Sequence, residues 1–225
     1  MALRALKPMR TSPLYPIALR LEGVPCLVVG GGRIAARKAN QLLECGAAVT
    51  VVAPKTSPEL DALRDRLGQL ERRAYLPGDL DKVRLAITAT GDAAVDHQVF
   101  ADGEAAGVLV NSADDPEACR FFLPAVHREG PVTVAVSTAG ASPYLATFLR
   151  RRIAGVVGPE VATVAALLSV ARAAIRSAGR SSESVDWGAV ADDDLLDLVA
   201  GGATAAAARR ISEWTATQLA SRPGR

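Results

Sequence analysis

The sequence predicts an α/β protein: a Rossmann-type doubly wound parallel sheet, then a small β-rich segment and a helical C-terminal domain. Three observations support this fold class. A short apolar run, Val24–Val29, leads into Gly30-Gly31-Gly32 and an amphipathic segment. Further apolar runs alternate with helical patterns to about residue 111. Beyond that point come β-rich runs and then alanine-rich stretches. Strands that alternate with helices are typical of a parallel sheet covered on both faces.

Five strands are expected in the first half of the chain. Strands of such a sheet are buried on both faces, so they are near-continuous aliphatic runs. The runs of this kind are Val24–Val29, Ala48–Ala53, Leu70–Leu76, Leu85–Thr90 and Val108–Asn111.

Helices between these strands are predicted from their end signals. Arg33–Cys45 and Ala93–Ala106 are each followed by a glycine, the residue suited to a left-handed helix end. Ser57-Pro58-Glu59 combines an N-cap serine, a proline at the first helical position and an acid. This signal predicts a helix that runs to about Leu67.

After residue 111 the pattern changes. Phe121–His127 and Val132–Thr138 are β-rich runs with Gly130-Pro131 between them, which predicts an antiparallel pair. Ser142-Pro143 then begins an arginine-rich helix, and the rest of the chain is predominantly helical. We therefore expect a basic arm at 1–13, a dinucleotide-binding domain at 14–111, a β-rich segment at 112–141 and a helical domain at 142–225.

Composition excludes several classes of function. Hydrophobic residues make up 49% of the 225, enough for a folded core. A net charge of +2 and 4% aromatic residues argue against a nucleic-acid partner. The longest apolar stretch, Val161–Ala171, is too short to span a bilayer, so no membrane partner is expected. Cys26, Cys45 and Cys119 form no C-x-x-C pair, which favours a reducing, cytoplasmic location.

The turn after the first strand has the pattern G-x-G-x-x-A. Gly30 permits the tight turn, Gly32 lets a pyrophosphate approach the backbone, and Ala35 lets the helix pack closely. The N–H groups of Arg33 and Ile34 are expected to face the phosphates at the helix N-terminus. The alternative is a turn that only reverses the chain. The βαβ spacing of the next apolar run favours a dinucleotide.

Two further segments are candidates for cofactor contact. Ala53-Pro54-Lys55 ends the second strand, where an NAD site usually has an acid for the ribose. This chain has none there, and Lys55 suits either the 2′-phosphate of NADP or solvent. Thr88, Ala89 and Thr90 end the fourth strand, where small residues leave room for the ribose and nicotinamide. The alternative is that these threonines are only good strand residues.

Taken in order, four motifs resemble one family. They are Gly30-Gly31-Gly32, Ala86–Thr90, Asn111–Asp114, and Val134–Thr138 continued by Gly140–Pro143. Together they resemble the precorrin-2 dehydrogenase and sirohydrochlorin ferrochelatase family, which is also the N-terminal module of bifunctional siroheme synthases. The resemblance covers roughly residues 14–155.

The resemblance implies an activity and partners. It implies NAD-dependent oxidation of precorrin-2 to sirohydrochlorin, with ferrous iron inserted by some members. It also implies a homodimer whose contact is built by the segment at 112–141. Two alternatives stay open: a non-catalytic NAD-sensing module, and a chelatase with a vestigial nucleotide site.

The candidate catalytic residue is Asp114, which follows the fifth strand at the rim where the nicotinamide is expected. Its carboxylate can accept a proton as hydride leaves the substrate. Repulsion from the adjacent Asp115 is expected to raise one of the two pKa values. The alternative is that Asp-Asp-Pro is an ordinary turn sequence.

Candidate substrate residues are polar groups suited to the carboxylates of precorrin-2. Ser142 offers a hydroxyl at a helix N-terminus, although it can equally be a plain N-cap. Arg120 and Arg150 offer forked hydrogen bonds, and Asn111 is assigned through the matching motif. His97 and His127 lack metal-ligand spacing, so no resident metal is expected.

Overall fold

The structure is a computed structural model that describes residues 13–220. The expected basic arm at 1–13 therefore lies, apart from Pro13, outside the described residues. The chain divides into two compact units. The first unit contains the residues up to Leu123 together with Ala139–Ala141, and the second contains Pro124–Thr138 and the chain from Ser142 onward. The predicted functional boundaries at residues 111 and 141 stay predictions.

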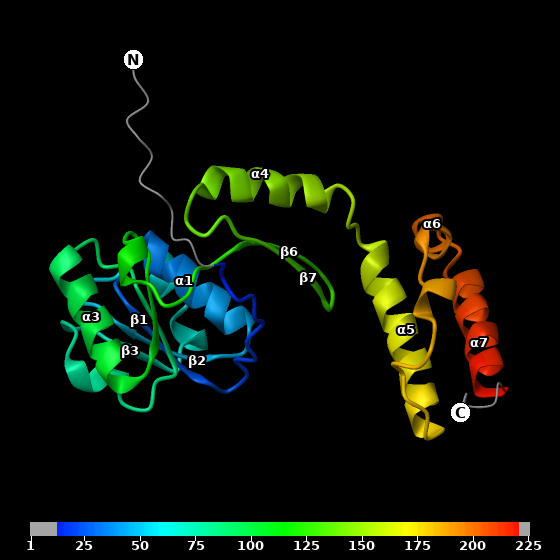
Figure 1. Ribbon diagram of the computed structural model, residues 1–225. Coiled ribbons are helices and arrows are strands. Elements are labelled where there is room, and N and C mark those ends of the chain that lie inside the picture. The colour runs from blue at the N-terminus through cyan, green and yellow to red at the C-terminus, as the bar shows by residue number, and fades with distance from the viewer. Residues whose placement is uncertain (1–12, 221–225) are drawn as a thin grey trace, which may run out of the picture. The chain divides into compact units, whose positions relative to one another are not determined.

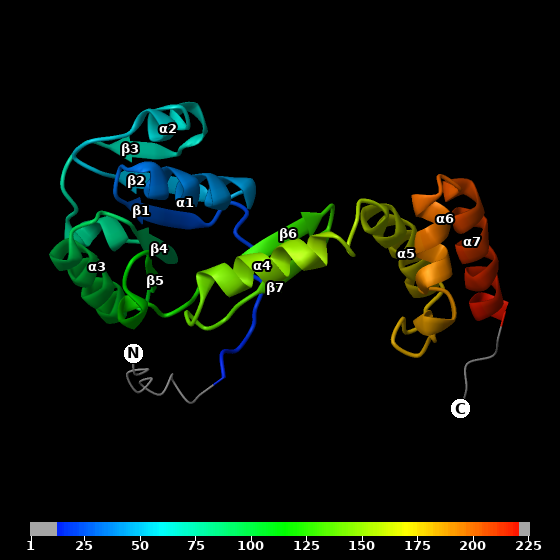
Figure 2. The same ribbon diagram turned by 90° about the horizontal axis from the view of Figure 1, so that it is seen from above.

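The first unit is built on a five-stranded sheet in which all neighbouring strands are parallel. The strand order is β3-β2-β1-β4-β5, which Figure 2 shows from above. The strands are β1 (Pro25–Val29), β2 (Ala48–Val52), β3 (Gln69–Glu71), β4 (Leu85–Thr88) and β5 (Leu109–Ser112). The predicted parallel sheet is confirmed.

Helices cover both faces of this sheet (Figure 1). In β1, Cys26 and Val28 pack with α1 (Arg33–Glu44), whereas Leu27 and Val29 pack against α3 (Ala93–Ala106). Successive strand residues point to opposite faces, so both sets are buried at once. The doubly wound arrangement predicted from the apolar runs is therefore confirmed.

Two predicted elements after β2 are shorter than expected. Ser57 caps α2 (Pro58–Asp61) as predicted, but only a 3₁₀ turn at Arg64–Arg66 follows. Leu63 and Leu67 still pack against the core, but beyond Asp61 the backbone tightens into i to i−3 bonds, such as Leu63 N–H to the carbonyl of Leu60 at 3.0 Å.

Strand β3 ends at Glu71 instead of Leu76 because the chain leaves the sheet there. Arg73 turns to pair with Asp79, and Pro77 begins a 3₁₀ helix, Pro77–Leu80.

The second unit begins with the expected antiparallel pair, β6 (Ala125–Glu129) and β7 (Val132–Val136). Strand β6 starts later than the predicted Phe121, because Pro124 has no N–H to donate to a strand partner. The helix α4 (Pro143–Ala154) packs on both strands, as Figure 2 shows.

Three further helices complete the second unit. They are α5 (Glu160–Ser177), α6 (Asp193–Ala200) and α7 (Thr204–Ala220), with a 3₁₀ turn, Trp187–Ala189, between the first two. Their shared core contains Leu195 and the ring pair Trp187–Trp214, whose centroids are 4.9 Å apart. Within residues 13–220, no helix is both long and apolar enough to cross a membrane.

The ion pair of Asp79 and Arg73 gives a pH-dependent prediction about stability. Their side chains meet at 2.6 and 2.8 Å, and Asp79 also accepts a 2.8 Å bond from the N–H of Leu76. The hydrogen bond from Arg73 holds the pKa of Asp79 below its ordinary value. Asp79→Asn should lower the free energy of unfolding at pH 7 by about 1 kcal/mol, because Arg73 is partly exposed.

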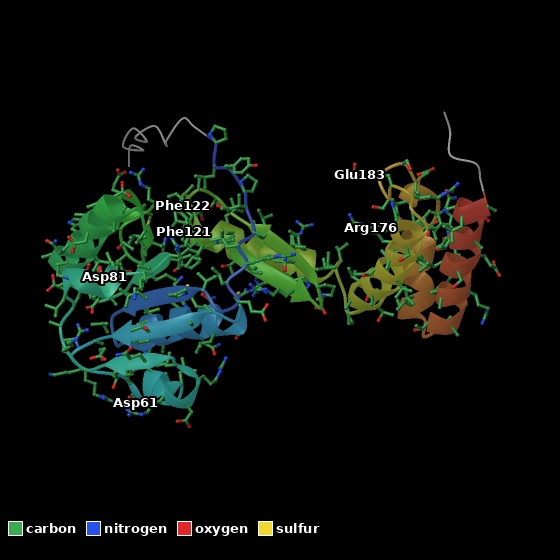
Figure 3. The ribbon with its side chains drawn as sticks, turned by 90° about the horizontal axis from the view of Figure 1, so that it is seen from below. Asp61, Asp81, Phe121, Phe122, Arg176 and Glu183 are labelled. Carbon is green, nitrogen blue, oxygen red and sulfur yellow. The ribbon has the colours of Figure 1, made fainter. Side chains whose placement is uncertain are left out.

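A lowered folded-state pKa means that this stabilisation is complete above the unfolded-state pKa, about 3.9. It is lost as the pH falls through the lower folded-state pKa, so the wild-type and Asp79→Asn values should converge in acid. Urea unfolding at a series of pH values measures this. The matched control is Asp81→Asn, since Asp81 is exposed (Figure 3). A difference that stays constant below pH 4 would contradict the assignment.

Candidate active site

The glycine turn between β1 and α1 is packed against two neighbouring carbonyl groups. Gly30 has a φ of +126°, and a β-carbon there would collide with the carbonyl oxygen of Ala89. A β-carbon at Gly31 would collide with the carbonyl oxygen of Lys55. At Gly32 a β-carbon would meet no protein atom within 4 Å. The fold therefore requires Gly30 and Gly31, whereas Gly32 borders open space.

The N-terminus of α1 fits a pyrophosphate. Gly32 is its N-cap and makes no side-chain cap bond, and the first turn holds no acid. The N–H groups of Arg33 and Ile34 have no acceptor within the helix, because the first turn lacks one by geometry. Donors and a positive helix end beside open space form an anion site. Ala35 is fully buried, which is the close helix–strand packing that the motif predicts.

The segment after β2, which is the second candidate for cofactor contact, borders this turn. The N–H of Ser57 donates to the carbonyl of Gly31 at 2.7 Å, which ties the two loops together. Ala53 is buried, whereas Pro54 and Lys55 are exposed. Pro54 and Lys55 are therefore accessible to a ligand, and contact of all three residues with a cofactor stays a prediction. Asp61, labelled in Figure 3, is engaged by Thr56 and Arg72, each at 2.8 Å, and the hydrogen bond from Thr56 lowers its pKa.

A buried carboxylate organises the turn after β4. Thr88 is fully buried, and its hydroxyl donates to Asp96 of α3. Thr90 donates to the same oxygen through its hydroxyl at 2.7 Å and its N–H at 3.4 Å. The strand therefore ends at Thr88, two residues earlier than predicted. The threonine hydroxyls are engaged with Asp96, and contact of Thr88, Ala89 and Thr90 with a cofactor stays a prediction.

A partly open hollow of about 150 Å³ lies beside this turn. It is bounded by the start of α3 and by the loop after β5, at the carboxyl edge of the parallel sheet, which is where ligands of open α/β sheets bind. Asp114, the predicted catalytic residue, is exposed and lines it. Its full lining is Gly91, Ala93, Asp96, His97, Ser112, Asp114 and Asp115.

The neighbouring Asp115 is held by two local partners. Its carboxylate lies 2.6 Å from Nε2 of His97 and accepts a 2.9 Å bond from the N–H of Glu117. The hydrogen bond from His97 lowers the pKa of Asp115. The rise expected for one of the two acids is therefore not found at Asp115, because its local partners favour the charged form. His97 is largely exposed and links α3 to the loop that carries Asp114.

Two predicted substrate residues of the first unit are engaged within the protein. Asn111 is buried, and its amide donates to the carbonyl of Phe121 at 2.8 Å and to the sulfur of Cys119 at 3.2 Å. Phe121 is labelled in Figure 3. The guanidinium of Arg120 pairs with Glu104, with one bond of 2.5 Å. Their roles toward a substrate stay predictions.

The second unit holds Ser142 and Arg150 on α4. The hydroxyl of Ser142 accepts the N–H of Leu145 at 3.2 Å, so it is an N-cap. Arg150 is half-buried on the same helix, and both substrate roles stay predictions. Tyr144 and Phe148 leave an apolar face of α4 exposed. Among the described residues, no group of three or more His, Cys, Asp or Glu side chains is placed to hold a metal ion.

The sequence interpretation missed three residues of this site. Gly31 occupies a position at which the dinucleotide pattern allows any residue. Glycine is required there because the carbonyl group of Lys55, 24 residues away in the chain, fills the space of a side chain. Asp96 is one polar residue in a helical pattern, and its role cannot be inferred from the sequence because it depends on hydrogen bonds from Thr88 and Thr90 in the folded protein. Ser112 sits in a short strand where serine looks unremarkable in sequence.

Comparisons with known proteins agree with this geometry. Residues 17–125 match the family model described as "Putative NAD(P)-binding", and residues 129–155 match "Sirohaem biosynthesis protein central". The chain is 40% identical over 214 residues to a siroheme synthase of Chromobacterium violaceum, covering 93% of this chain and 45% of that protein. A siroheme synthase of Methylococcus capsulatus is 43% identical over 164 residues, covering 72% and 35%. The chain spans less than half the length of these relatives.

A solved structure is also similar. SirC, precorrin-2 dehydrogenase, superposes with a TM-score of 0.65 at 27% identity, covering 91% of this chain and 100% of that one. The glycine turn, the uncapped helix and these matches define a Rossmann-fold protein that binds a nicotinamide dinucleotide. More particularly, the chain belongs to the precorrin-2 dehydrogenase family, whose members include the N-terminal modules of siroheme synthases.

The three glycines should separate folding from binding. Gly31→Ala forces a β-carbon onto the carbonyl of Lys55, so it should destabilise the first unit by about 1–3 kcal/mol. Gly32→Ala meets no protein atom and should change stability by less than about 1 kcal/mol. Its methyl group fills the space assigned to the pyrophosphate, so the affinity for NAD should fall about tenfold or more.

Thermal unfolding and calorimetric titration with NAD measure the two effects on the same preparations. Wild-type affinity in Gly32→Ala would show that the dinucleotide does not lie against this turn.

Proposed function

We propose that this protein catalyses the NAD-dependent oxidation of precorrin-2 to sirohydrochlorin in siroheme biosynthesis. One observation carries the proposal. Asp114 lines a hollow at the carboxyl edge of the parallel sheet, and the uncapped N-terminus of α1 lies at the same edge. Membership of the precorrin-2 dehydrogenase family and the likeness to SirC support the choice of substrate.

The residues of the first unit divide the work in this proposal. The N–H groups at the start of α1 bind the pyrophosphate, and the turn tied to Asp96 shapes the wall beside the hollow. A bound nicotinamide supplies the acceptor for the hydride. One hydride passes from the macrocycle to the nicotinamide. The carboxylate of Asp114 accepts the one proton that leaves the macrocycle. Aromatic conjugation of the product favours this direction.

We propose NAD in preference to NADP. Glu59 lies in the first turn of α2, and the N-cap of this helix, Ser57, donates its N–H to the carbonyl of Gly31 at 2.7 Å. An acid on this side of the phosphate turn suits an unphosphorylated ribose. Lys55 is exposed and is assigned to solvent.

Further features of the family extend the proposal. The exposed face of α4 with Tyr144 and Phe148 supports a homodimer. The exposed carboxylate of Asp114 supports the optional insertion of ferrous iron as a substrate, by receiving pyrrole protons or guiding the metal. The cysteines Cys26, Cys45 and Cys119 form no disulfide, which supports a reducing, cytoplasmic location.

The open space at Gly32 argues against the alternative of a chelatase with a vestigial nucleotide site. Asp114 beside the hollow argues against a non-catalytic NAD sensor, which needs no proton acceptor there.

Asp114→Asn tests the catalytic assignment. The amide keeps the size of the side chain but cannot accept the proton, so turnover of precorrin-2 should fall about 10²–10⁴-fold while the NAD dissociation constant stays within about twofold. The assay is anaerobic formation of the sirohydrochlorin spectrum with NAD and, separately, NADP. Glu117→Gln, which changes an exposed acid of the same loop, is the matched control. Undiminished turnover in Asp114→Asn would remove this residue from the mechanism.

A further inference from the structure

We propose that Ser112 is a specificity-determining residue whose hydroxyl hydrogen-bonds the carboxamide of the bound nicotinamide. The proposal rests on the proposed function, because it takes the dinucleotide site of the first unit as given. It begins from one unusual atom, the hydroxyl oxygen of Ser112 at the end of β5.

This hydroxyl is buried and has no hydrogen-bond partner among residues 13–220. Ser112 as a whole is only 4% exposed. Most buried polar groups in native proteins are paired, because an unpaired one forfeits its hydration without compensation. The adjacent Asn111 shows the usual situation, since its amide has two partners. The hydroxyl of Ser112 is therefore able to donate a hydrogen bond to a bound ligand and to accept one from it.

The position of Ser112 shows where that ligand enters. Ser112 lines the hollow together with Asp96 and Asp114. The volume of about 150 Å³ equals that of a protein cavity known to admit benzene, so the hollow accommodates one aromatic ring. A serine hydroxyl can turn among three staggered rotamers to meet a group in the hollow.

The order of the strands in the sheet indicates that the aromatic ring in this hollow is the nicotinamide. The phosphate turn follows β1, and the adenosine side lies at β2. The other end of the dinucleotide must extend in the opposite direction, over β4 toward β5, where the hollow lies.

The chemistry of the lining suits a carboxamide. The three bonds that Asp96 accepts through its side chain all go to Oδ1, which leaves Oδ2 as an acceptor for an amide N–H. The Ser112 hydroxyl can donate to the amide carbonyl. A carboxylate in place of the carboxamide would instead meet the charges of Asp96 and Asp114, so the hollow selects the amide.

The test compares two ligands in the full-length protein, NAD and ADP-ribose, which lacks the nicotinamide. In Ser112→Ala the affinity for NAD should fall about threefold to tenfold, the loss of one hydrogen bond, while that for ADP-ribose is unchanged. The melting temperature of the ligand-free variant should be unchanged or higher, because a buried unpaired hydroxyl has been removed.

The matched control is Thr215→Val, which removes a buried hydroxyl bonded to the carbonyl of Ile211 in α7. It should leave the binding of both ligands unchanged. Equal weakening of both ligands by Ser112→Ala, or no weakening of either, would overturn the assignment of Ser112 and leave the proposed function standing. A wild-type protein that binds neither ligand would overturn the proposed function and this proposal with it.

Discussion

The first unit depends on the close approach of backbone to backbone at Gly30 and Gly31. At both positions the space for a side chain is already filled by a carbonyl oxygen, from Ala89 after β4 and from Lys55 after β2. The turn is therefore held between two loops that come from strands on either side of β1. Only glycine lets three loops meet this closely, and their meeting places the N-terminus of α1 at the sheet edge.

The same edge is stabilised from the other side by Asp96. Its buried carboxylate draws in the hydroxyls of Thr88 and Thr90, ends β4, and so sets the position of Ala89 against Gly30. A carboxylate that is 4% exposed is costly to bury, and three hydrogen bonds to one oxygen offset that cost. The glycine turn between β1 and α1 and the turn after β4 thus form one connected structure, although they are about 60 residues apart in the chain.

Most of the first unit could be predicted because its signals are local. The strands β1, β2 and β4 are continuous apolar runs, α3 has its N-cap Asp92 and its terminal glycine, and the glycine pattern predicts the tight turn between β1 and α1. The place of Asp114 at the sheet edge follows from its position after a strand, and its catalytic role stays a prediction. The ends of β3 and α2 were mispredicted because two details of hydrogen bonding, which the apolar pattern does not reveal, decide them: the pairing of Arg73 with Asp79 after β3, and the change to i to i−3 backbone bonds after α2. Asp96, Gly31 and Ser112 were missed because their roles exist only through partners brought close by the fold.

The three carboxylates of the hollow show why this distinction matters for chemistry. In sequence Asp96, Asp114 and Asp115 are equivalent acids. In the structure Asp96 is committed to two threonines and Asp115 to His97. Within the described part of the chain, Asp114 alone of the three has no hydrogen bond or ion pair of its side chain. A proton acceptor must be free to approach its donor, and a carboxylate that already holds strong partners is a weaker base. The partners of its neighbours therefore support the proposal that Asp114, and not Asp96 or Asp115, takes a proton from the substrate.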